Sequence, residues 1–586
     1  MKKAKGVVVA VLTAGMLLSA TALAAGQDAP VVAREVKGGV ESVQVTNGTY
    51  PLHEVELTES QQQAMEKIYQ IVPELKELTV EGVHEGGEDA WGVTLSNRAG
   101  EAVSGIMCIR ASLSFKTGTN ELVRFDIRNP DWASLELPPA ELAKEKAYEF
   151  ARQVLGDKIK DYRMSDGIGF SSGGARDSKG NEINWTEAGV QFERLINGIP
   201  MLNSGIRVDV DAAGHVTEYY TDGFYQINGG IKYEEPDLAA FPSPALAITG
   251  EAAEEIFAGL LEMKLNYVGS FPLQYPKYRS GEVETRPVLM YAPSAYASID
   301  AVTGEPLAGF QQPPQISLVS LTGEGKKLVA ATPEEAAALL AAETGMDIAG
   351  MKLSGEDEVE ESLQPGIKVK TYHLNSEPQT GQDGTPDYST MRYLYLRTLA
   401  DTGQVVGFNL QDEAGHGEKA TVSRAAAQET AIQFLQRYLD RGAAEMEMYV
   451  SWPQEESIPD WVDRSKLEGN EQRPEYNFAF TCTHQGIPVS DRGYSVTVDG
   501  LTGGITAFHD RNSSSSVTLP DSKNVVTAEA AKAEFLKSHP LRLVYLWPEY
   551  YGQKAPEPVL VYMPDHGAGM EYIDAFTGKT VTAEMD

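Results

Sequence analysis

The sequence PVLMYAPSAYASIDAVTGEPL occupies residues 287–307. A similar sequence, PVLVYMPDHGAGMEYIDAFTGKTV, occupies residues 558–581. Both read Pro-Val-Leu-x-Tyr-x-Pro, then a variable loop, then Ile-Asp-Ala-x-Thr-Gly. A Pro-x-Tyr triplet also precedes each of them. So many matches in the same order indicate a duplicated segment of structure.

The residues of the repeat suggest what each part does. Val288, Leu289 and Tyr291 are typical of a strand that enters a hydrophobic core, because β-branched and aromatic side chains suit a half-buried sheet. Ile299 is predicted on the strand that returns after the loop. Asp300, with the glycine four residues later, is typical of a tight turn.

Further pairs extend the duplication over much of the chain. NGIPMLNSGIRVDVDAAGHVTEYY from Asn197 resembles QGIPVSDRGYSVTVDGLTGGITAF from Gln485, and KTGTNELVRF from Lys116 resembles ADTGQVVGF from Ala400. Ahead of the longer pair, an apolar helix face is repeated, with Ala143, Ala147 and Phe150 recurring as Ala427, Ala431 and Phe434. The offsets all lie between about 270 and 290 residues, which indicates one ancestral block copied whole.

Helical periodicity predicts six helices, at residues 60–72, 139–155, 250–263, 333–344, 423–438 and 528–538. β-rich segments follow each one. The fold class that we predict is α+β, with six tandem units, each a helix packed on an antiparallel sheet, in two homologous triplets. The expected boundaries are a signal peptide at 1–24, a spacer at 25–51, units at 52–130, 137–225 and 243–310, a linker at 311–329, and units at 330–412, 422–511 and 525–586.

A comparable turn occurs in each predicted unit. An Asp can accept hydrogen bonds from amides across a short turn, and Gly supplies the positive φ that closes it. A catalytic or calcium-binding Asp is the alternative, although each turn offers too few carboxylates for calcium. The six turns are KTGTN at 116, DAAGH at 211, DAVTG at 300, ADTGQ at 400, DGLTGG at 499 and DAFTG at 574.

The Val-x-Val-Asp turn pattern and the Val-Leu-x-Tyr to Ile-Asp-Ala-x-Thr-Gly pattern resemble the YcdB/YcdC-type repeats of exported bacterial proteins. The resemblance covers most of the chain after the predicted signal peptide, and the first and fourth units match it least. It implies units similar to PepSY propeptide modules or cystatins. PepSY modules are similar to segments that chaperone or inhibit secreted peptidases, and that role is implied here by the resemblance alone.

The beginning of the sequence predicts export. Lys2, Lys3 and Lys5 precede an apolar run and a small-residue site at 22–24, which is typical of a secretory signal peptide. Its removal changes the formal charge from −35 to −38. So acidic a chain argues against nucleic acid as a partner and favours either a solvated acidic surface or recruitment of cations or a basic partner.

Chemical motifs are scarce. There is no His-Glu-x-x-His, no Gly-rich phosphate loop ending in Gly-Lys-Ser/Thr and no paired-cysteine zinc site. GFSSG at 169–173 satisfies a nucleophile-elbow pattern around Ser171, but the flanking sequence does not favour the strand and helix that an elbow needs. Cys108 and Cys482 are expected as buried free thiols, with a single long-range bridge as the alternative.

The acidic segments 355–362 and 376–387 are expected to be solvated hairpin loops, with cation binding as the alternative. We therefore predict no catalytic, cofactor-binding or metal-binding residue, no cofactor and no enzymatic activity. The leading hypothesis is an exported, non-catalytic protein that binds or modulates another extracytoplasmic protein, such as a peptidase, through strand addition at a sheet edge. A structural cell-envelope scaffold and an unrecognised hydrolase are the alternatives.

Overall fold

The computed structural model describes residues 31–36, 39–44, 57–85, 89–97, 108–176, 182–221, 224–227, 230–233, 237–272, 285–307, 316–360, 367–380, 385–387, 390–412, 418–451, 458–467, 473–512, 517–565 and 571–582. Over these residues the chain is an α+β protein with two large sheets. We call residues 57–307 the first half and residues 316–582 the second half.

Six α-helices are present in the described residues, and their bounds confirm the predicted ranges to within three residues. A Thr or Ser side chain caps five of them. Thr332, for example, accepts from the amide of Glu335, and Pro333 fills the first helical position. The helices are α1 (Glu59–Ile71), α2 (Ala140–Leu155), α3 (Gly250–Leu260), α4 (Pro333–Thr344), α5 (Arg424–Tyr438) and α6 (Ala528–Ser538).

The first sheet has 11 strands and is mainly antiparallel. Its strands from the first half are β3 (Thr79–Glu85), β4 (Ala90–Ser96), β5 (Arg110–Lys116), β6 (Leu122–Arg128), β7 (Tyr162–Arg176), β8 (Glu182–Ile196), β9 (Ile199–Asp211), β10 (Val216–Thr221) and β15 (Ile299–Asp300). The second half contributes β27 (Leu541–Leu546) and β30 (Val559–Pro564). The main path runs β15-β30-β27-β9-β10-β6-β5-β4-β3, and β8 and β7 branch from β9.

The second sheet has 13 strands and repeats this plan. The second half contributes β16 (Ile316–Gly323), β17 (Lys352–Glu360), β18 (Lys368–Asn375), β21 (Arg392–Leu399), β22 (Val405–Asp412), β23 (Gly442–Ser451), β24 (Glu475–His484), β25 (Ile487–Asp499), β26 (Ile505–Asp510), β31 (Glu571–Asp574) and β32 (Thr580–Thr582). The first half contributes β13 (Glu262–Pro272) and β14 (Thr285–Ala295).

Short elements complete the described chain. The paired strands are β1 (Val31–Val36) with β2 (Gly39–Gln44), β11 (Phe224–Ile227) with β12 (Gly230–Tyr233), β19 (Gln379–Thr380) with β20 (Pro386–Asp387), and β28 (Glu549–Tyr550) with β29 (Gln553–Lys554). The 3-10 helices are η1 (Pro73–Glu77), η3 (Pro130–Trp132), η4 (Gly156–Asp161), η5 (Leu238–Ala240), η6 (Pro244–Leu246) and η8 (Arg464–Lys466).

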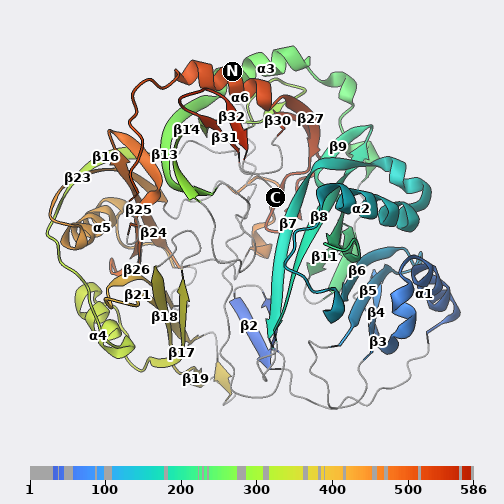
Figure 1. The fold of residues 1–586 in the computed structure, drawn as a ribbon, viewed down its shortest axis with the longest axis horizontal. Coiled ribbons are helices and arrows are strands. Elements are labelled where there is room, and N and C mark those ends of the chain that lie inside the picture. The colour runs from blue at the N-terminus through green and yellow to red at the C-terminus, as the bar shows by residue number, and fades with distance from the viewer. Residues whose placement is uncertain are drawn as a thin grey trace.

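The helices pack on one face of each sheet and lie around the outside of the molecule, while the strands face its middle (Figure 1). The repeated apolar positions form this packing. Phe150 of α2 and Phe434 of α5 are buried against the two sheets, as are the repeated alanines of their helix faces. Burying such a phenylalanine stabilises the fold by about 1.5–3 kcal/mol relative to leaving it exposed.

The repeated stretch explains how the two halves are joined, because each half gives its returning strand to the other. Strand β15, with Ile299, pairs with β30, where Ile299 lies opposite Tyr562. Conversely β31 pairs with β14, where Ile573 lies opposite Tyr291. The helices are exchanged as well, since α3 packs on β15 and β27, and α6 packs on β13, β31 and β32. The third helix of each half therefore covers strands of the other half.

Two parallel contacts attach these exchanged segments to the rest of each sheet. Tyr545 of β27 lies opposite Met201 of β9, and Tyr267 of β13 lies opposite Val489 of β25. Seen in Figure 1, the arrangement has approximate twofold symmetry, with α3 and α6 at the top, α2 and α1 on the right, and α5 and α4 on the left.

The expected turn chemistry is confirmed. The carboxylate of Asp300 accepts from the amides of Val302 and Thr303, both at 2.8 Å, and Gly304 has φ 74°. Asp211, Asp499 and Asp574 accept amide hydrogen bonds in the same manner at the other Asp-led turns. These carboxylates are therefore part of the turn structure.

Two expectations drawn from composition were wrong. Residues 316–323, inside the expected linker, form strand β16, which pairs with β23 over its whole length. Residues 355–360, expected as a solvated loop, belong to strand β17. Its acidic side chains face basic partners on β18, where Lys368 lies 3.8 Å from Glu358 and Lys370 lies 4.0 Å from Glu356. Part of the second acidic segment forms β19 and β20, and residues 361–362 and 381–384 of the two segments lie outside the described residues.

Candidate functional site

Strand β8 continues beyond its neighbour β9. It pairs with β7 from Glu182 onward, whereas its pairing with β9 begins at Glu187, opposite Asp211. Strand β9 stops there because Asp211 turns the chain, accepting from the amides of Ala213 and His215. Residues 172–176 of β7 and 182–186 of β8 consequently form a two-stranded extension, which we call the projecting ribbon.

A groove lies beside the outer end of the projecting ribbon. Its volume is about 380 Å³, and it is lined by Pro130, Asp131, Ala133, Ser134 and Leu135 on one side and by Glu182, Ile183 and Asn184 on the other. Between these, Trp132 is held in place by stacking on His215, with ring centroids 4.1 Å apart and an angle of 8° between the planes. The loop at residues 130–135 therefore forms a fixed wall beside β8.

The β8 side of the projecting ribbon has unused hydrogen-bonding capacity. Within the described part of the chain, the buried atoms Asn184 Oδ1 and Thr186 Oγ1 have no hydrogen-bond partner. They belong to alternate residues of the strand, so both side chains lie on the same face. Leaving a buried polar atom unpaired costs about 1–3 kcal/mol, which a bound polar group could recover.

The opposite face of the ribbon is charged. Arg128 of β6 donates to Glu187 at 2.5 Å, and its guanidinium lies 5.1 Å from the ring centre of Trp185. Glu187 is buried, so this ion pair shields a carboxylate with little access to water. Burial raises the pKa of the nearby Glu218, and the negative charges of Asp126 and Asp209 raise it further.

Ser171, the centre of the GFSSG pattern, lies in the middle of β7. It is opposite Glu187 in the pairing with β8, and strand continues on both sides of it. A nucleophile elbow requires a sharp turn from strand to helix, so the pattern here does not have the structure of an elbow. Its glycine has another role: a Cβ on Gly173 would come within 2.8 Å of the Trp185 ring, so glycine lets the indole lie across β7.

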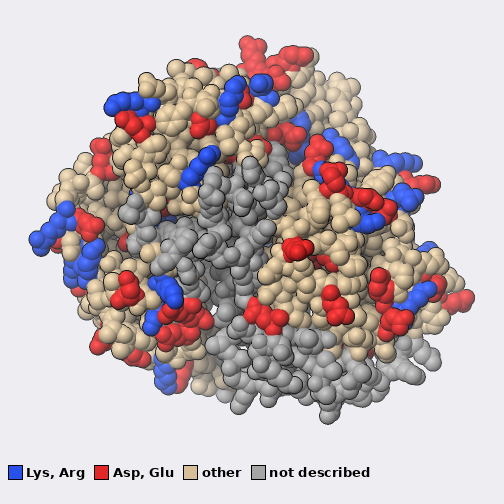
Figure 2. Space-filling model, viewed as in Figure 1, with Lys and Arg blue, Asp and Glu red and all other residues tan. Residues whose placement is uncertain are grey.

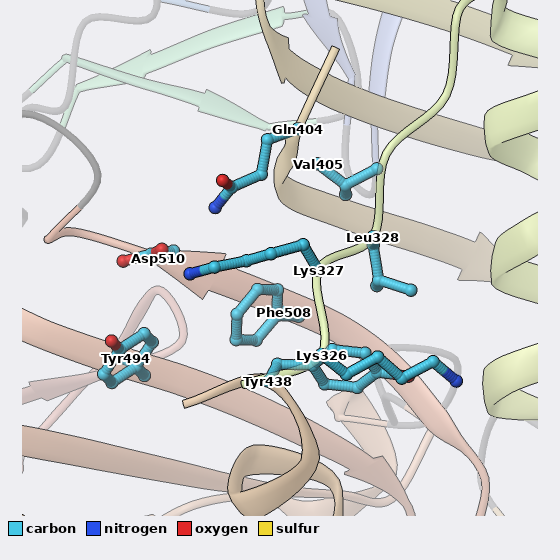
Figure 3. Close-up of a pocket in the computed structure, with 9 residues that line it drawn as sticks. All are labelled: Lys326, Lys327, Leu328, Gln404, Val405, Tyr438, Tyr494, Phe508 and Asp510. Carbon is cyan, nitrogen blue, oxygen red and sulfur yellow. The ribbon is translucent and has the colours of Figure 1, made fainter. Parts of the chain in front are cut away.

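A second cavity lies in the second half, where the chain between β16 and α4 passes α5, β25 and β26 (Figure 3). The ammonium of Lys327 extends past Phe508 toward the carboxylate of Asp510. Burial raises the pKa of Asp510, while hydrogen bonds from Asn512 and the charge of Lys327 oppose the rise. The cavity measures about 20 Å³, which is room for about one water molecule, so it is too small for an organic ligand.

Both cysteines are free thiols. Cys108 is buried just before β5, and Cys482 lies partly buried in β24. Burial raises the pKa of the Cys482 thiol to about 11, and the negative charge of Asp510 adds to the effect. In the described residues no group of three or more His, Cys, Asp or Glu side chains is placed to hold a metal ion. Nor does any described helix have the length and apolar character needed to cross a membrane.

Sequence reasoning missed the projecting ribbon and its groove. It placed residues 130–135 at the boundary between two units and treated GFSSG only as a possible elbow. The available signal was the length of the strand at residues 182–196, which extends five residues beyond the part that pairs with β9. Acidic and basic side chains are scattered over the face of the molecule shown in Figure 2.

A family described as the YcdB, YcdC repeated domain matches the chain twice, over residues 58–223 and 397–512. Both segments are therefore similar to the YcdB/YcdC repeat family. The first YcdB/YcdC match contains the projecting ribbon and both walls of its groove, and the second contains α5 and strands β24 and β25, which pack on it. This agrees with the family resemblance seen in the repeated patterns.

Beyond the YcdB/YcdC repeat match, similarity to known proteins is slight. The C-terminal domain of YpeB from Bacillus megaterium is 13% identical, and the alignment covers 44% of this chain and 99% of that domain with a TM-score of 0.23. A TM-score this low carries no weight for the fold or the function. No curated protein matches the chain significantly.

Proposed function

We propose that the chain is an exported, non-catalytic protein that binds an extended segment of another extracytoplasmic protein, such as a peptidase. The observation that carries the proposal is the edge of β8 at residues 183–186, where, among the described strands, β8 pairs with β7 and not with β9, beside the groove against loop 130–135. An extended segment placed there would add a strand to β8, gaining main-chain hydrogen bonds, while its side chains would enter the groove.

The chemistry of the groove suggests what kind of segment it binds. Asp131 and Glu182 are the charged residues of the described lining, and both are acidic. The chain as a whole has a formal charge of −35. A segment carrying Lys or Arg would be attracted by both the local and the overall charge, which favours fast association with a basic partner.

The proposal also includes the division of the chain into repeat units, one of which carries the site. The chain consists of six helix-and-sheet units in two triplets, with the boundaries given by the sequence except that residues 316–323 of the expected linker form strand β16, and residues 1–24 direct export and are removed. Helix and strand order, the two family matches and the repeated turns support this arrangement. The ribbon then belongs to the second unit of the first triplet.

The test is partner capture from culture medium with the tagged, exported protein. Ala133→Trp places a large side chain in the groove, and Ala245→Trp, at an exposed position in η6, is the matched control. We expect wild type and the control to capture the same protein and the groove variant to lose it at least about tenfold, which corresponds to about 1.4 kcal/mol of binding free energy. Thermal melting of both variants checks that they remain folded.

A second measurement addresses the mode of binding and its consequence. When the captured partner is added, amide hydrogen exchange at residues 182–186 should slow, because an added strand protects edge amides. Peptidase assays then separate a modulator from a scaffold, since a scaffold captures envelope material and leaves peptidase rates unchanged. Equal capture by the groove variant and wild type would refute the site.

A further inference from the structure

The projecting ribbon distinguishes two parts of the molecule that are otherwise repeated. Strand β24 corresponds to β8, because the Asp that begins the repeated turn lies opposite Glu475 in one and opposite Glu187 in the other. Strand β24 begins at the residue where its pairing with β25 begins, whereas β8 begins five residues before its pairing with β9. Pro474 occupies the position equivalent to Thr186, and its carbonyl accepts from the amide of Gly500 at 2.7 Å. The repeated fold therefore forms without the ribbon.

Three side chains that can accept hydrogen bonds lie in a row along β8 of the ribbon. Glu182, Asn184 and Thr186 are alternate residues of the strand, so they lie on one face, and the first two line the groove. The amide nitrogen of Asn184 donates to Glu182 at 3.0 Å, so the amide oxygen faces away from that carboxylate. Across the described residues, that oxygen and the Thr186 hydroxyl have no hydrogen-bond partner.

Thr186 is the most informative member of this row. It is only 3% exposed, and a buried hydroxyl without a partner destabilises a fold. Valine has nearly the same shape and would remove that cost, so stability alone favours valine at this position. The threonine is accounted for if a donor reaches it when another segment binds beside β8.

We propose that the groove selects segments in which hydrogen-bond donors alternate with apolar side chains. The inference rests on the proposed function, because it requires the segment to pair with β8 as an added strand. Directly opposite side chains of paired strands lie on the same face. Residues opposite Glu182, Asn184 and Thr186 therefore supply donors, and Lys or Arg suits the position opposite the carboxylate. The residues between them lie opposite Ile183 and Trp185 and are apolar.

Two peptides of identical composition test the alternation on the full exported chain. One alternates Lys and Val over six residues, and the other has three Lys followed by three Val, so the two peptides have the same charge and the same apolar content. Titration calorimetry measures both dissociation constants. We expect the alternating peptide to bind at least about tenfold more tightly, and to slow amide hydrogen exchange at residues 183–186.

Thr186→Val separates binding from stability. It should bind the alternating peptide about tenfold more weakly, because a donor of the peptide then meets a methyl group, yet it should melt at or above the wild-type temperature. Thr371→Val, at a buried threonine of β18 in the second half, is the matched control and should bind the peptide as wild type does.

The outcomes distinguish this inference from the proposed function. Equal affinity for the two peptides, with exchange slowed at residues 183–186 by both, would overturn the alternation and leave strand addition in place. Unchanged affinity of Thr186→Val for the alternating peptide would overturn the role of the hydroxyl in selection. If neither peptide binds or slows exchange at these residues, both the alternation and the strand addition at this edge are wrong.

Discussion

The hydroxyl of Tyr291 in β14 donates a hydrogen bond to the main-chain carbonyl of Val526, 2.7 Å away and just ahead of α6. In the other half, Tyr562 of β30 donates in the same way to the carbonyl of Ile248, 2.9 Å away and just ahead of α3. These are the tyrosines of the repeated Pro-Val-Leu-x-Tyr sequence. Each one connects a strand of its own half to the segment that begins the third helix of the other half.

Removing these hydroxyls should weaken the connection between the halves. We expect Tyr291→Phe and Tyr562→Phe each to lower the free energy of unfolding by about 1 kcal/mol, because each leaves a carbonyl without its donor. Denaturant titration followed by intrinsic fluorescence measures the change. Tyr148→Phe, at a 46% exposed position on α2, is the control and should stay within about 0.5 kcal/mol of wild type. Equal stability of all three variants would show that the two bonds contribute nothing.

The exchange of strands also makes each half incomplete. If residues 25–311 and 312–586 are produced as two chains in one cell, we expect a tag on either chain to purify both, because β15 pairs with β30 and β31 pairs with β14. Ala301→Pro in the first chain removes the amide that donates to the carbonyl of Leu560 at 2.8 Å, and it should reduce the recovery of the second chain. Two halves that elute separately as stable monomers would contradict the exchange.

The helices were predictable because their signals are local. Apolar side chains three and four residues apart and a capping Thr or Ser fix the position of α4 or α5 without reference to the rest of the chain. The pairing of β15 was not predictable in this way. Ile299 and Ile573 occur in the same short motif, and either hairpin could pair with the Val-Leu-x-Tyr strand of either half. The path of the whole chain decides between them.

The strands mistaken for a linker and for a loop show a second limit. Residues 316–323 lie between a Pro- and Gln-rich segment and GEGKK, so composition favoured a linker, but β23 supplies a pairing partner more than 100 residues later. The acids of β17 are stabilised by Lys368 and Lys370 across the strand pair. The groove beside the projecting ribbon exists because β9 ends before β8 does. Its prediction therefore also requires knowing how two separate segments pair, which the local sequence of one segment does not show.

The repeated glycines Gly205 and Gly493 are required by close packing. Both have positive φ, 149° and 153°, and a Cβ would lie 1.9 Å from the carbonyl oxygen of Phe192 or 2.0 Å from that of Phe480. We expect Gly493→Ala to lower the free energy of unfolding by about 3 kcal/mol or more, because strand pairing must shift to relieve the overlap. Urea titration measures this. Gly250→Ala, at the start of α3 with open space around it, should instead be neutral or stabilising by about 0.5–1 kcal/mol. A similar effect of both changes would count against the packing argument.

Glu343 at the end of α4 should make stability depend on pH. Lys326 and Tyr438 donate to its carboxylate, the latter at 2.5 Å, and these hydrogen bonds lower the pKa of Glu343 in the folded chain although burial opposes them. A carboxyl group with a lowered folded pKa stabilises the protein above its unfolded pKa, about 4.3, and the contribution is lost as the pH falls through the folded value.

We therefore expect Glu343→Gln to be less stable than wild type at pH 7 and the difference to shrink as the pH is lowered from about 5 to 3. Denaturant titrations at a series of pH values measure it. Glu254→Gln, at an exposed position on α3, is the control and should follow the wild-type curve. If the difference in the free energy of unfolding between Glu343→Gln and wild type stays constant from pH 7 to pH 3, the charge of the carboxylate does not stabilise the contact between α4 and α5.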